Sequence, residues 1–351
     1  MADLELPDAL RDDLRAAWHR YLDSVQPLRP ALHAYCRRLT PSLWDAEDLV
    51  QETLLRAFGS LGRIHDPVRN PRAYLLRTAT HLWIDQHRRR EREAAALAEA
   101  EELAEAEAAA GAAGRTTPSG ELRDAGRRLL RLPPRERAAV LLKDVFDLDL
   151  EESAEVLATT VGAVKAALHR GRERLREPEP KREPAVRAPR RMQPSLSLVD
   201  RFVELFNKAD KPGLLELVLD HATVDNVGVG VHWTPEGHRS ARSMFEGSLG
   251  GHPEWPAWIQ FESQRVERAI FRGEPLVLHF HVRRGREWFD GLMRLEEEDG
   301  RISSMRAYGF CPETIREVGE ELGLPVLTGL YRAPTPVPGR YFEKGWNRGE
   351  A

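Results

Sequence analysis

The apolar positions of residues 1–90 and 121–177 recur at spacings of three and four residues, which predicts amphipathic helices rather than strands. Asp45 precedes one such run and is expected to cap its helix, with further acidic residues in the first turn. Asn70 and Pro71 predict the start of the next helix, since asparagine caps well and proline fits the first helical position. The N-terminal half is therefore expected to be all-α.

The second of these segments carries clear start and stop signals. Pro134 suits the first turn of a helix, and Asp149 with Glu152 forms a capping box for a short second helix. A break at 158–160 precedes a longer helix that begins near Val161. A short helix, a tight turn and a longer helix together predict a helix-turn-helix module.

The pattern changes after residue 195. Two amphipathic stretches, Ser195–Lys208 and Pro212–Leu219, predict helices. Four alternating runs then predict strands: Ile259–Arg265, Leu276–Arg284, Trp288–Leu295 and Ile302–Tyr308. Asp299-Gly300, between the last two runs, is typical of a two-residue hairpin turn. Two or three helices packed on a curved antiparallel sheet make an α+β domain.

Two segments have the composition of linkers. Residues 91–120 begin as a run of Ala and Glu without an apolar face and continue with Gly, Ser, Thr and Pro. We interpret them as a flexible connector; the alternative is a solvated structural helix. Residues 178–194 are rich in proline, which favours extended backbone. The predicted multi-domain order is two all-α helical modules, the second a helix-turn-helix, and an α+β cone: 1–90, 91–120 (linker), 121–177, 178–194 (linker), 195–332 and 333–351 (tail).

Composition adds a location and a kind of partner. The 351 residues suffice for two or more domains, and 41% hydrophobic against 31% charged residues is typical of a globular protein. No apolar stretch is long enough to cross a membrane, no secretory signal is visible, and two distant cysteines exclude a disulfide framework, so a cytoplasmic location is expected. The formal net charge is −4, yet residues 165–191 carry ten basic and four acidic residues, a local charge of +6. This concentration favours contact with nucleic acid.

The helix expected from Asp45 presents an acidic and amide face, because residues four apart in a helix are neighbours. Its members are Glu47, Asp48, Gln51 and Glu52. Charges on a helix usually form a solvated face. The sharper interpretation is docking onto a basic protein surface.

The helix expected from Pro71 combines cations with aromatic rings: Arg72, Tyr74, Arg77, Trp83, Arg88 and Arg89. Cations along a groove, with rings on which bases can stack, are what binding of single-stranded nucleic acid requires. Trp83 taken alone is more typical of a hydrophobic core.

The longer helix of the helix-turn-helix has a basic side. Lys165, His169 and Arg172 follow one another at spacings of four and three, so they share a face, and Arg170 lies beside them. The second helix of such a module enters the major groove, where its side chains reach base edges. These four residues are the candidates for reading DNA sequence.

Several motifs resemble those of bacterial sigma factors. The motifs of the polymerase-binding helix, of the part that melts the −10 promoter element, and of the module that reads the −35 element are, in this order, Asp45–Phe58, Asn70–Thr80 with Arg88–Arg90, and Leu132–Leu142 with Val161–Leu175. Their order and separation are similar to the compact extracytoplasmic-function (ECF) group, and the resemblance covers roughly 20–177. It implies core RNA polymerase and promoter DNA as partners.

The resemblance also adds one residue to the −10 candidates. His81 stands where the family usually has Asn, at a position implicated in holding an unstacked promoter base. The base preferred there is left open by this departure. The same resemblance implies that the acidic face containing Glu47 docks onto polymerase.

The segment after residue 195 resembles the SnoaL-like, or ketosteroid-isomerase-like, cone, which in some sigma factors of this group implies regulation rather than catalysis. Enzymes of this fold use an acid or base inside the cone, and the candidate pocket residues here are Asp225, His279, His281 and Tyr308. If the apolar face of their strand is the packed one, both histidines point outward. No third ligand follows at a recognisable spacing, so neither a metal nor another cofactor is expected.

The sequence therefore predicts an RNA polymerase sigma factor, not an enzyme, whose C-terminal domain regulates its activity and responds to any small molecule that enters the cone. One alternative is a SnoaL-like isomerase, cyclase or hydrolase fused to DNA-binding modules. Another is a helix-turn-helix regulator that does not engage polymerase. The acidic face argues against this last alternative, since a simple repressor has no need of it.

Overall fold

The chain folds as two units in the computed structural model, which describes residues 8–61, 68–102, 128–177, 193–227, 232–233, 249 and 262–328. The helical unit is Pro27–Pro184, and the sheet unit combines Met1–Gln26 with Ala185–Ala351. The first residues thus group with the C-terminal part, whereas the sequence pattern placed them in the first helical module. Among the described residues, none of the helices has the length and apolar character needed to span a bilayer.

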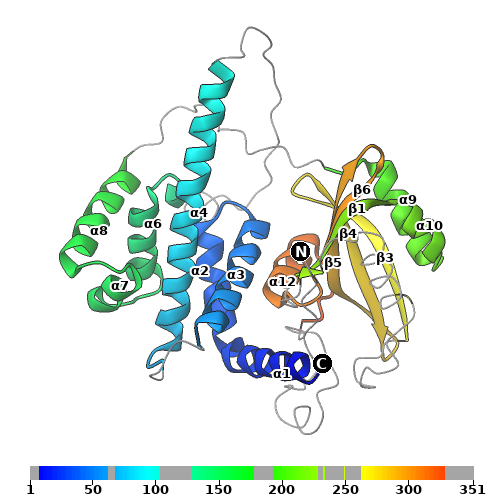
Figure 1. Ribbon diagram of the computed structural model, residues 1–351, viewed down its shortest axis with the longest axis horizontal. Helices are drawn as coiled ribbons and strands as arrows, with labels where there is room; N and C mark the ends of the chain where they lie inside the picture. Colours follow the sequence, from blue (N-terminus) through cyan, green and yellow to red (C-terminus); the bar gives the residue numbers. More distant parts are fainter. Residues whose placement is uncertain are drawn as a thin grey trace. The chain divides into compact units, whose positions relative to one another are not determined.

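The described elements of the helical unit are all helices, as predicted (Figure 1). Its first module contains α2 (Arg29–Leu39), α3 (Leu43–Leu61) and α4 (Pro71–Glu102), and its second contains α6 (Pro134–Val140), the π-helical turn η2 (Leu141–Val145), α7 (Leu150–Val156) and α8 (Val161–Arg176). Before them lie α1 (Asp8–Val25), in the sheet unit, and the short 3-10 helix η1 (Gln26–Leu28).

The predicted starts of the first-module helices are confirmed for α4 and corrected for α3. The Asn70 side chain accepts a hydrogen bond from the Ala73 amide at 3.0 Å, so it caps α4 as expected. Helix α3 begins earlier than predicted, because the Ser42 hydroxyl accepts from the Trp44 amide at 3.1 Å. Asp45 therefore lies inside the first turn and is not the cap.

The second module is the predicted helix-turn-helix. Asp149 accepts from the Glu152 amide at 2.6 Å, and the Glu152 carboxylate accepts from the Asp149 amide at 3.0 Å, which completes the capping box of α7. Ala158 then adopts a left-handed conformation (φ 48°), which turns the chain sharply. Thr160 caps α8 by accepting from the Ala163 amide at 3.2 Å.

Helix α4 continues further than predicted. It runs to Glu102, so the first part of the expected flexible connector is helical, and the alternative interpretation as a structural helix is correct there. The high helix propensity of consecutive Ala and Glu residues explains the extension. The rest of the predicted linker, 103–120, lies outside the described residues, as do most of 178–194 and all of the predicted tail.

The sheet unit has the predicted α+β architecture. Its elements after residue 195 are α9 (Leu196–Asn207), α10 (Lys211–Glu216), β1 (Val218–Asn226), β2 (His232–Trp233), β3 (Ser263–Phe271), β4 (Glu274–Arg283), β5 (Arg286–Glu298), β6 (Arg301–Ala307) and α12 (Pro312–Leu322). The strand order is β2-β1-β6-β5-β4-β3, and the sheet is mixed because β1 and β6 run parallel while the other neighbours are antiparallel.

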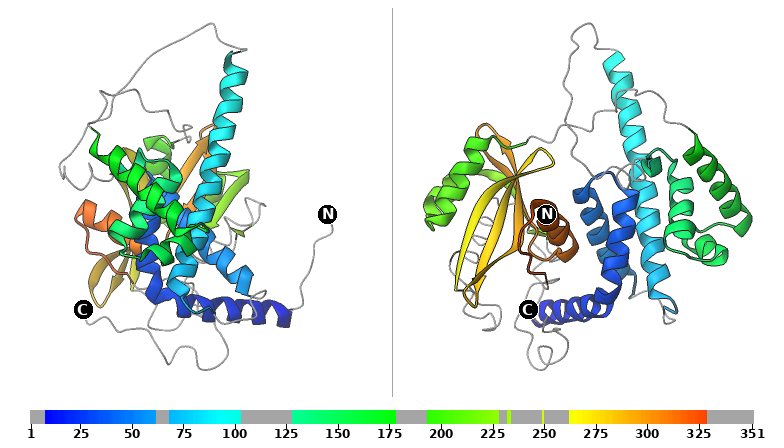
Figure 2. Two further views of the ribbon diagram at one scale, coloured as in Figure 1. Left: turned by 90° about the vertical axis from the view of Figure 1, so that its left-hand side faces the viewer. Right: turned by 180° about the vertical axis from the view of Figure 1, so that it is seen from behind.

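Helices cover both faces of this sheet. Helix α9 packs on β3 and β4, and α12 lies on the opposite face against β5 (Figures 1 and 2). The core between α9 and the sheet is continuous and includes Phe202, Phe206, Val277, Met293 and Met305. On the other face, Gly319 of α12 lies so close to Phe289 that an added Cβ would be 3.1 Å from its ring. Two covered faces leave β4 with few outward positions.

Three tight hairpins join β3 to β6. Asp299-Gly300 has positive φ at both residues, as the predicted two-residue turn requires. Arg272-Gly273 and Arg284-Gly285 have the same geometry but were not predicted as turns. Because the first of these turns ends β3 at Phe271, the strand spans 263–271, and its prediction at Ile259–Arg265 was placed too early.

Candidate functional site

The predicted acidic face of α3 has a buried part. The Glu47 carboxylate is fully buried and accepts from the Arg29 guanidinium at 2.7 Å and from the Gln51 amide at 2.6 Å. His33 lies 3.8 Å from its other oxygen. A carboxylate held in this way joins α2 to α3. The prediction of Glu47 as a docking residue is therefore wrong, because its side chain faces the core rather than a partner.

The remaining members of the acidic face are more accessible. Asp48, Gln51 and Glu52 are partly exposed on α3, and Glu52 pairs loosely with Arg56 at 3.4 Å. Asp45 extends this face by one turn and lies 3.8 Å from Arg90 of α4. The accessible acidic face is thus narrower than predicted, and its role in docking stays a prediction.

The residues of α4 that were predicted to act on the −10 element differ in exposure. The exposed ones are Arg72, Arg77, Arg88 and Arg89. Tyr74 and His81 are partly buried, and burial together with the Arg77 cation lowers the pKa of His81, so its imidazole is neutral at pH 7. Trp83 is only 4% exposed and offers no free ring face in this structure. For Trp83 the core interpretation is the correct one.

Arg137 of α6 covers the Trp83 ring, with its guanidinium carbon 5.0 Å from the ring centroid. The guanidinium also donates to the backbone carbonyls of Leu39 at 2.7 Å, Leu132 at 3.1 Å and Leu130. Arg137 is 5% exposed, and burial lowers its pKa to about 10, so it remains charged at pH 7. One buried cation thus joins the helix-turn-helix module to α2 and α4.

Phe146, which follows η2, makes a second contact with the first module. Its ring meets the Tyr35 ring edge-on at 5.3 Å between centroids, and the Arg38 guanidinium lies 5.7 Å from it. The Phe146 carbonyl accepts from Arg72 at 3.4 Å. Through these contacts the helix-turn-helix module engages two of the −10 candidates, Arg72 and Trp83.

The recognition helix α8 presents two kinds of basic residue. Lys165 and His169 are exposed, and the only printed partner of His169 is its own-helix neighbour Glu173 at 3.3 Å. Arg170 pairs with Glu136 at 3.0 Å and Arg172 with Asp144, through hydrogen bonds of 3.0 and 2.5 Å. These two arginines link α8 to α6 and η2. Lys165 and His169 are therefore the better placed to meet DNA.

The predicted pocket residues of the sheet unit lie on two faces. Asp225 is paired in register with Arg306 and accepts from its guanidinium at 3.2 Å, and Tyr308 follows on the same face under the Arg306 guanidinium. His279 and His281 lie on the other face, where the core under α9 continues. A single pocket containing all four residues is therefore not formed.

The histidines of β4 point inward, contrary to prediction. His279 meets the Phe206 ring of α9 edge-on at 5.7 Å between centroids, and the two imidazoles are 4.4 Å apart. The prediction failed because it took one face of β4 as the packed one, whereas α9 and α12 cover both. Burial, followed by the neighbouring His281, lowers the pKa of His279 to about 4.

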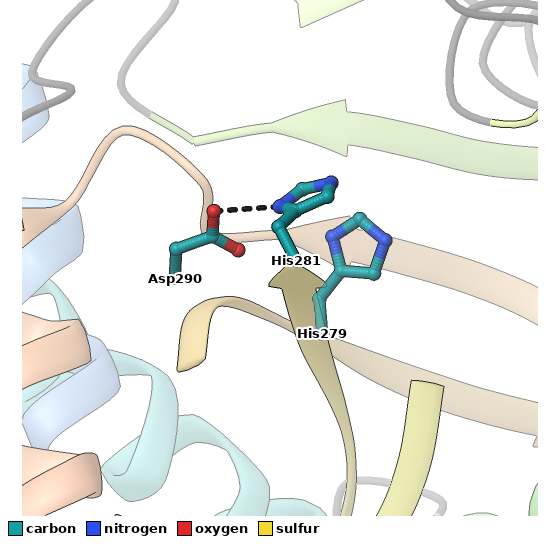
Figure 3. Close-up of side chains that lie close together, drawn as sticks. All are labelled: His279, His281 and Asp290. Atoms are coloured by element: carbon teal, nitrogen blue, oxygen red, sulfur yellow. Dashed lines mark hydrogen bonds and ion pairs between the residues drawn. The ribbon is translucent and has the colours of Figure 1, made fainter. Parts of the chain in front are cut away.

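Asp290 of β5 joins the two histidines (Figure 3). Its Oδ2 lies 2.6 Å from His281 Nδ1, and one ligand atom from each of the three residues lies within 4.8 Å of the other two. A bulge brings Asp290 to this face: Phe280 pairs with Phe289 and His279 with Gly291, so Asp290 is the extra residue. The sequence carried one signal for it, a glycine inside an apolar strand.

Comparison with known proteins agrees with these modules. Residues 25–93 match the family model described as Sigma-70 region 2, and residues 122–175 match that described as Sigma-70, region 4. The ECF RNA polymerase sigma factor SigW of Bacillus subtilis is 30% identical over 164 residues, which cover 45% of this chain and 87% of SigW.

Two solved structures are similar at a lower level. The ECF sigma factor SigJ of Mycobacterium tuberculosis aligns over 82% of this chain and 95% of SigJ, with 20% identity and a TM-score of 0.30. An NTF-2 like protein of unknown function from Burkholderia xenovorans aligns over 32% of this chain and 79% of its own, with 12% identity and a TM-score of 0.24.

The helical unit defines a class of protein. A compact helical module followed by a helix-turn-helix, matching the two conserved regions of sigma-70 proteins, belongs to a promoter-specific transcription initiation factor. The chain is a member of the ECF family of RNA polymerase sigma factors. Proteins of this family bind core RNA polymerase and promoter DNA and are not enzymes.

Proposed function

We propose that this sigma factor, acting in the cytoplasm, is held by its own helical unit in a closed state that must open before a promoter is bound. The observation that carries this proposal is the buried Arg137, which binds the Leu39 carbonyl and covers Trp83 of α4. While this contact persists, the module for the −35 element occupies part of the helix that is proposed to act at the −10 element.

The promoter itself requires the two modules to separate. The −10 and −35 elements are about 25 base pairs apart, which is roughly 80 Å at about 3.4 Å per base pair. Modules that share a buried arginine cannot span that distance. Polymerase and promoter therefore favour the open state by their differential affinity for it, and anything that stabilises the closed contact lowers activity.

We propose that Arg72, Tyr74, Arg77, His81, Arg88 and Arg89 of α4 act on the −10 element, with Trp83 available only once α6 has left it. The half-buried, neutral His81 can donate or accept a hydrogen bond to a flipped base, which a protonated imidazole cannot do. On α3, the accessible Asp48, Gln51 and Glu52 are the proposed polymerase-docking residues.

For the −35 element we expect the exposed Lys165 and His169 to read bases, while Arg170 and Arg172 mainly hold α8 in place. Replacing Lys165 or His169 by Ala should relax preference at particular base pairs by about 1–3 kcal/mol each. Arg176→Ala, in the last turn of α8, is the control that should weaken all sequences alike. Selection of bound sequences from a random pool measures this. An unaltered consensus in both variants would exclude α8 as the reader.

We further propose that the C-terminal domain sets the closed–open equilibrium and that a small molecule taken up by it shifts that equilibrium. A domain on a short tether acts at an effective concentration near millimolar, so a weak contact suffices. Truncation after Arg191 should therefore change promoter-dependent transcription by several-fold.

Run-off transcription with core polymerase over a set of promoters checks this expectation. Equal transcript yields from the full-length and truncated chains would contradict regulation. The alternative, a SnoaL-like enzyme attached to DNA-binding modules, predicts that result together with turnover of a small substrate that is lost on His279→Gln.

A further inference from the structure

The cluster of His279, His281 and Asp290 has the composition of a metal site. Two imidazole nitrogens and a carboxylate oxygen lie within 4.8 Å of one another, contributed by adjacent strands β4 and β5 (Figure 3). Strand positions hold such side chains more rigidly than loop positions do. The exposed side-chain fractions of His281 and Asp290 are 12% and 6%, so water competes weakly for them.

Hydrogen bonds orient His279 for binding. Its Nε2 lies 3.1 Å from Oε1 of Gln264, which accepts, so Nε2 carries the proton. The lone pair is therefore on Nδ1, the nitrogen that faces His281 and Asp290 in Figure 3. A second imidazole nitrogen donating to an amide or carboxylate oxygen is the usual support of a metal-binding histidine.

Asp290 supplies an independent sign of a ligand. Its Oδ1 is a buried oxygen without a hydrogen-bond partner among the described residues, although burying an unsatisfied carboxylate oxygen is costly. The β-bulge that turns Asp290 toward His281 also makes room, because Gly291, opposite His279, has no side chain to fill the space.

We propose that His279, His281 and Asp290 bind a divalent first-row transition-metal ion, of which Zn²⁺ is the representative. Imidazole nitrogen suits this class, whereas Mg²⁺ and Ca²⁺ prefer sites built wholly of oxygen. With bonds of about 2.0–2.2 Å, tetrahedral ligands stand about 3.4 Å apart. The 2.6 Å contact between His281 and Asp290 must therefore widen on binding, and the ion replaces the proton between them.

The proposal does not depend on how the C-terminal domain acts in transcription. Because the ring of Phe206 in α9 contacts His279, an occupied site should tie α9 and β4 together. We therefore expect Zn²⁺ to raise the Tm of the full-length chain, in addition to binding it.

Titration of the metal-stripped full-length chain with Zn²⁺ by calorimetry, and with Co²⁺ by visible absorption, tests the site. His279→Gln, His281→Gln and Asp290→Asn keep side-chain size but should each weaken the tightest binding by about 100-fold or more. His221→Gln is the matched control. It removes another histidine–carboxylate pair of the same domain, the exposed one with Glu298 at 3.2 Å, and should leave that binding unchanged.

Two results would overturn the proposal. One is the same stoichiometry and affinity in the wild-type chain and in the three site variants, which would leave the trio as a hydrogen-bonded cluster. The other needs no variant and so does not depend on their folding: crystals of the full-length chain grown with Zn²⁺ should give an anomalous peak within bonding distance of all three side chains. A peak elsewhere alone, or none, contradicts the assignment.

Discussion

Replacing Arg137 by Ala is expected to destabilise the helical unit by about 3–5 kcal/mol and to release α6 from α4. The guanidinium is buried and donates to carbonyls of Leu39, Leu130 and Leu132, and hydrogen bonds from a charged donor contribute about 1.5–3 kcal/mol each. Its loss also uncovers the Trp83 ring. Few other single changes in the described part of this unit remove so many contacts between its modules.

Urea denaturation of the full-length chain measures the loss in stability, and hydrogen exchange of the α4 amides measures the release. Arg131→Ala, at an exposed arginine of the same module, is the control and should change the free energy of unfolding by less than about 0.5 kcal/mol. Arg137→Lys keeps the charge but not the planar fork, so an intermediate loss is expected. Unchanged exchange of α4 in Arg137→Ala would show that this residue does not hold the modules together.

Replacing Glu47 by Ala should destabilise the chain by about 3–5 kcal/mol, because it leaves the buried Arg29 without its carboxylate. Glu52→Ala, on the partly exposed side of α3, should cost less than about 0.5 kcal/mol. Thermal and urea unfolding of the two variants make this comparison.

The same pair of positions separates a structural role from docking. Reversing Asp48 and Glu52 together to Lys should slow association with core polymerase and leave unfolding nearly unchanged, because like charges then meet across the interface. If Glu47→Ala were as stable as the wild-type chain and yet failed to bind polymerase, the buried pair would not be the reason for its presence.

Local signals predicted much of the fold. The caps at Asn70, Thr160 and Ser195 and the Asp149–Glu152 box depend on hydrogen bonds between residues three apart, and the break before α8 follows directly. The two-residue periodicity located three of the strands closely, and the Asp-Gly turn fixed one hairpin. Interactions of this range can be recognised without knowing the tertiary structure.

The errors arose where distant parts of the chain meet. Glu47 looks like a surface acid until Arg29, on another helix, is packed against it. Arg137 is one of many arginines in the sequence, and its value comes from carbonyls and a ring on other elements. The inward histidines of β4 required knowledge that helices cover both faces of the sheet, and Asp290 required the bulge.

The distance between α4 and α8, measured by electron–electron resonance, tests the closed-to-open account most directly. Spin labels at Asp85→Cys and Glu173→Cys are on exposed positions, and the native Cys36 and Cys311 are buried. We expect a single short distance in the free full-length chain and an increase of roughly 20 Å or more in the complex with core polymerase and promoter DNA, where the two modules occupy separate promoter elements. The same distance distribution in the free chain and in a transcription-competent complex would contradict the account.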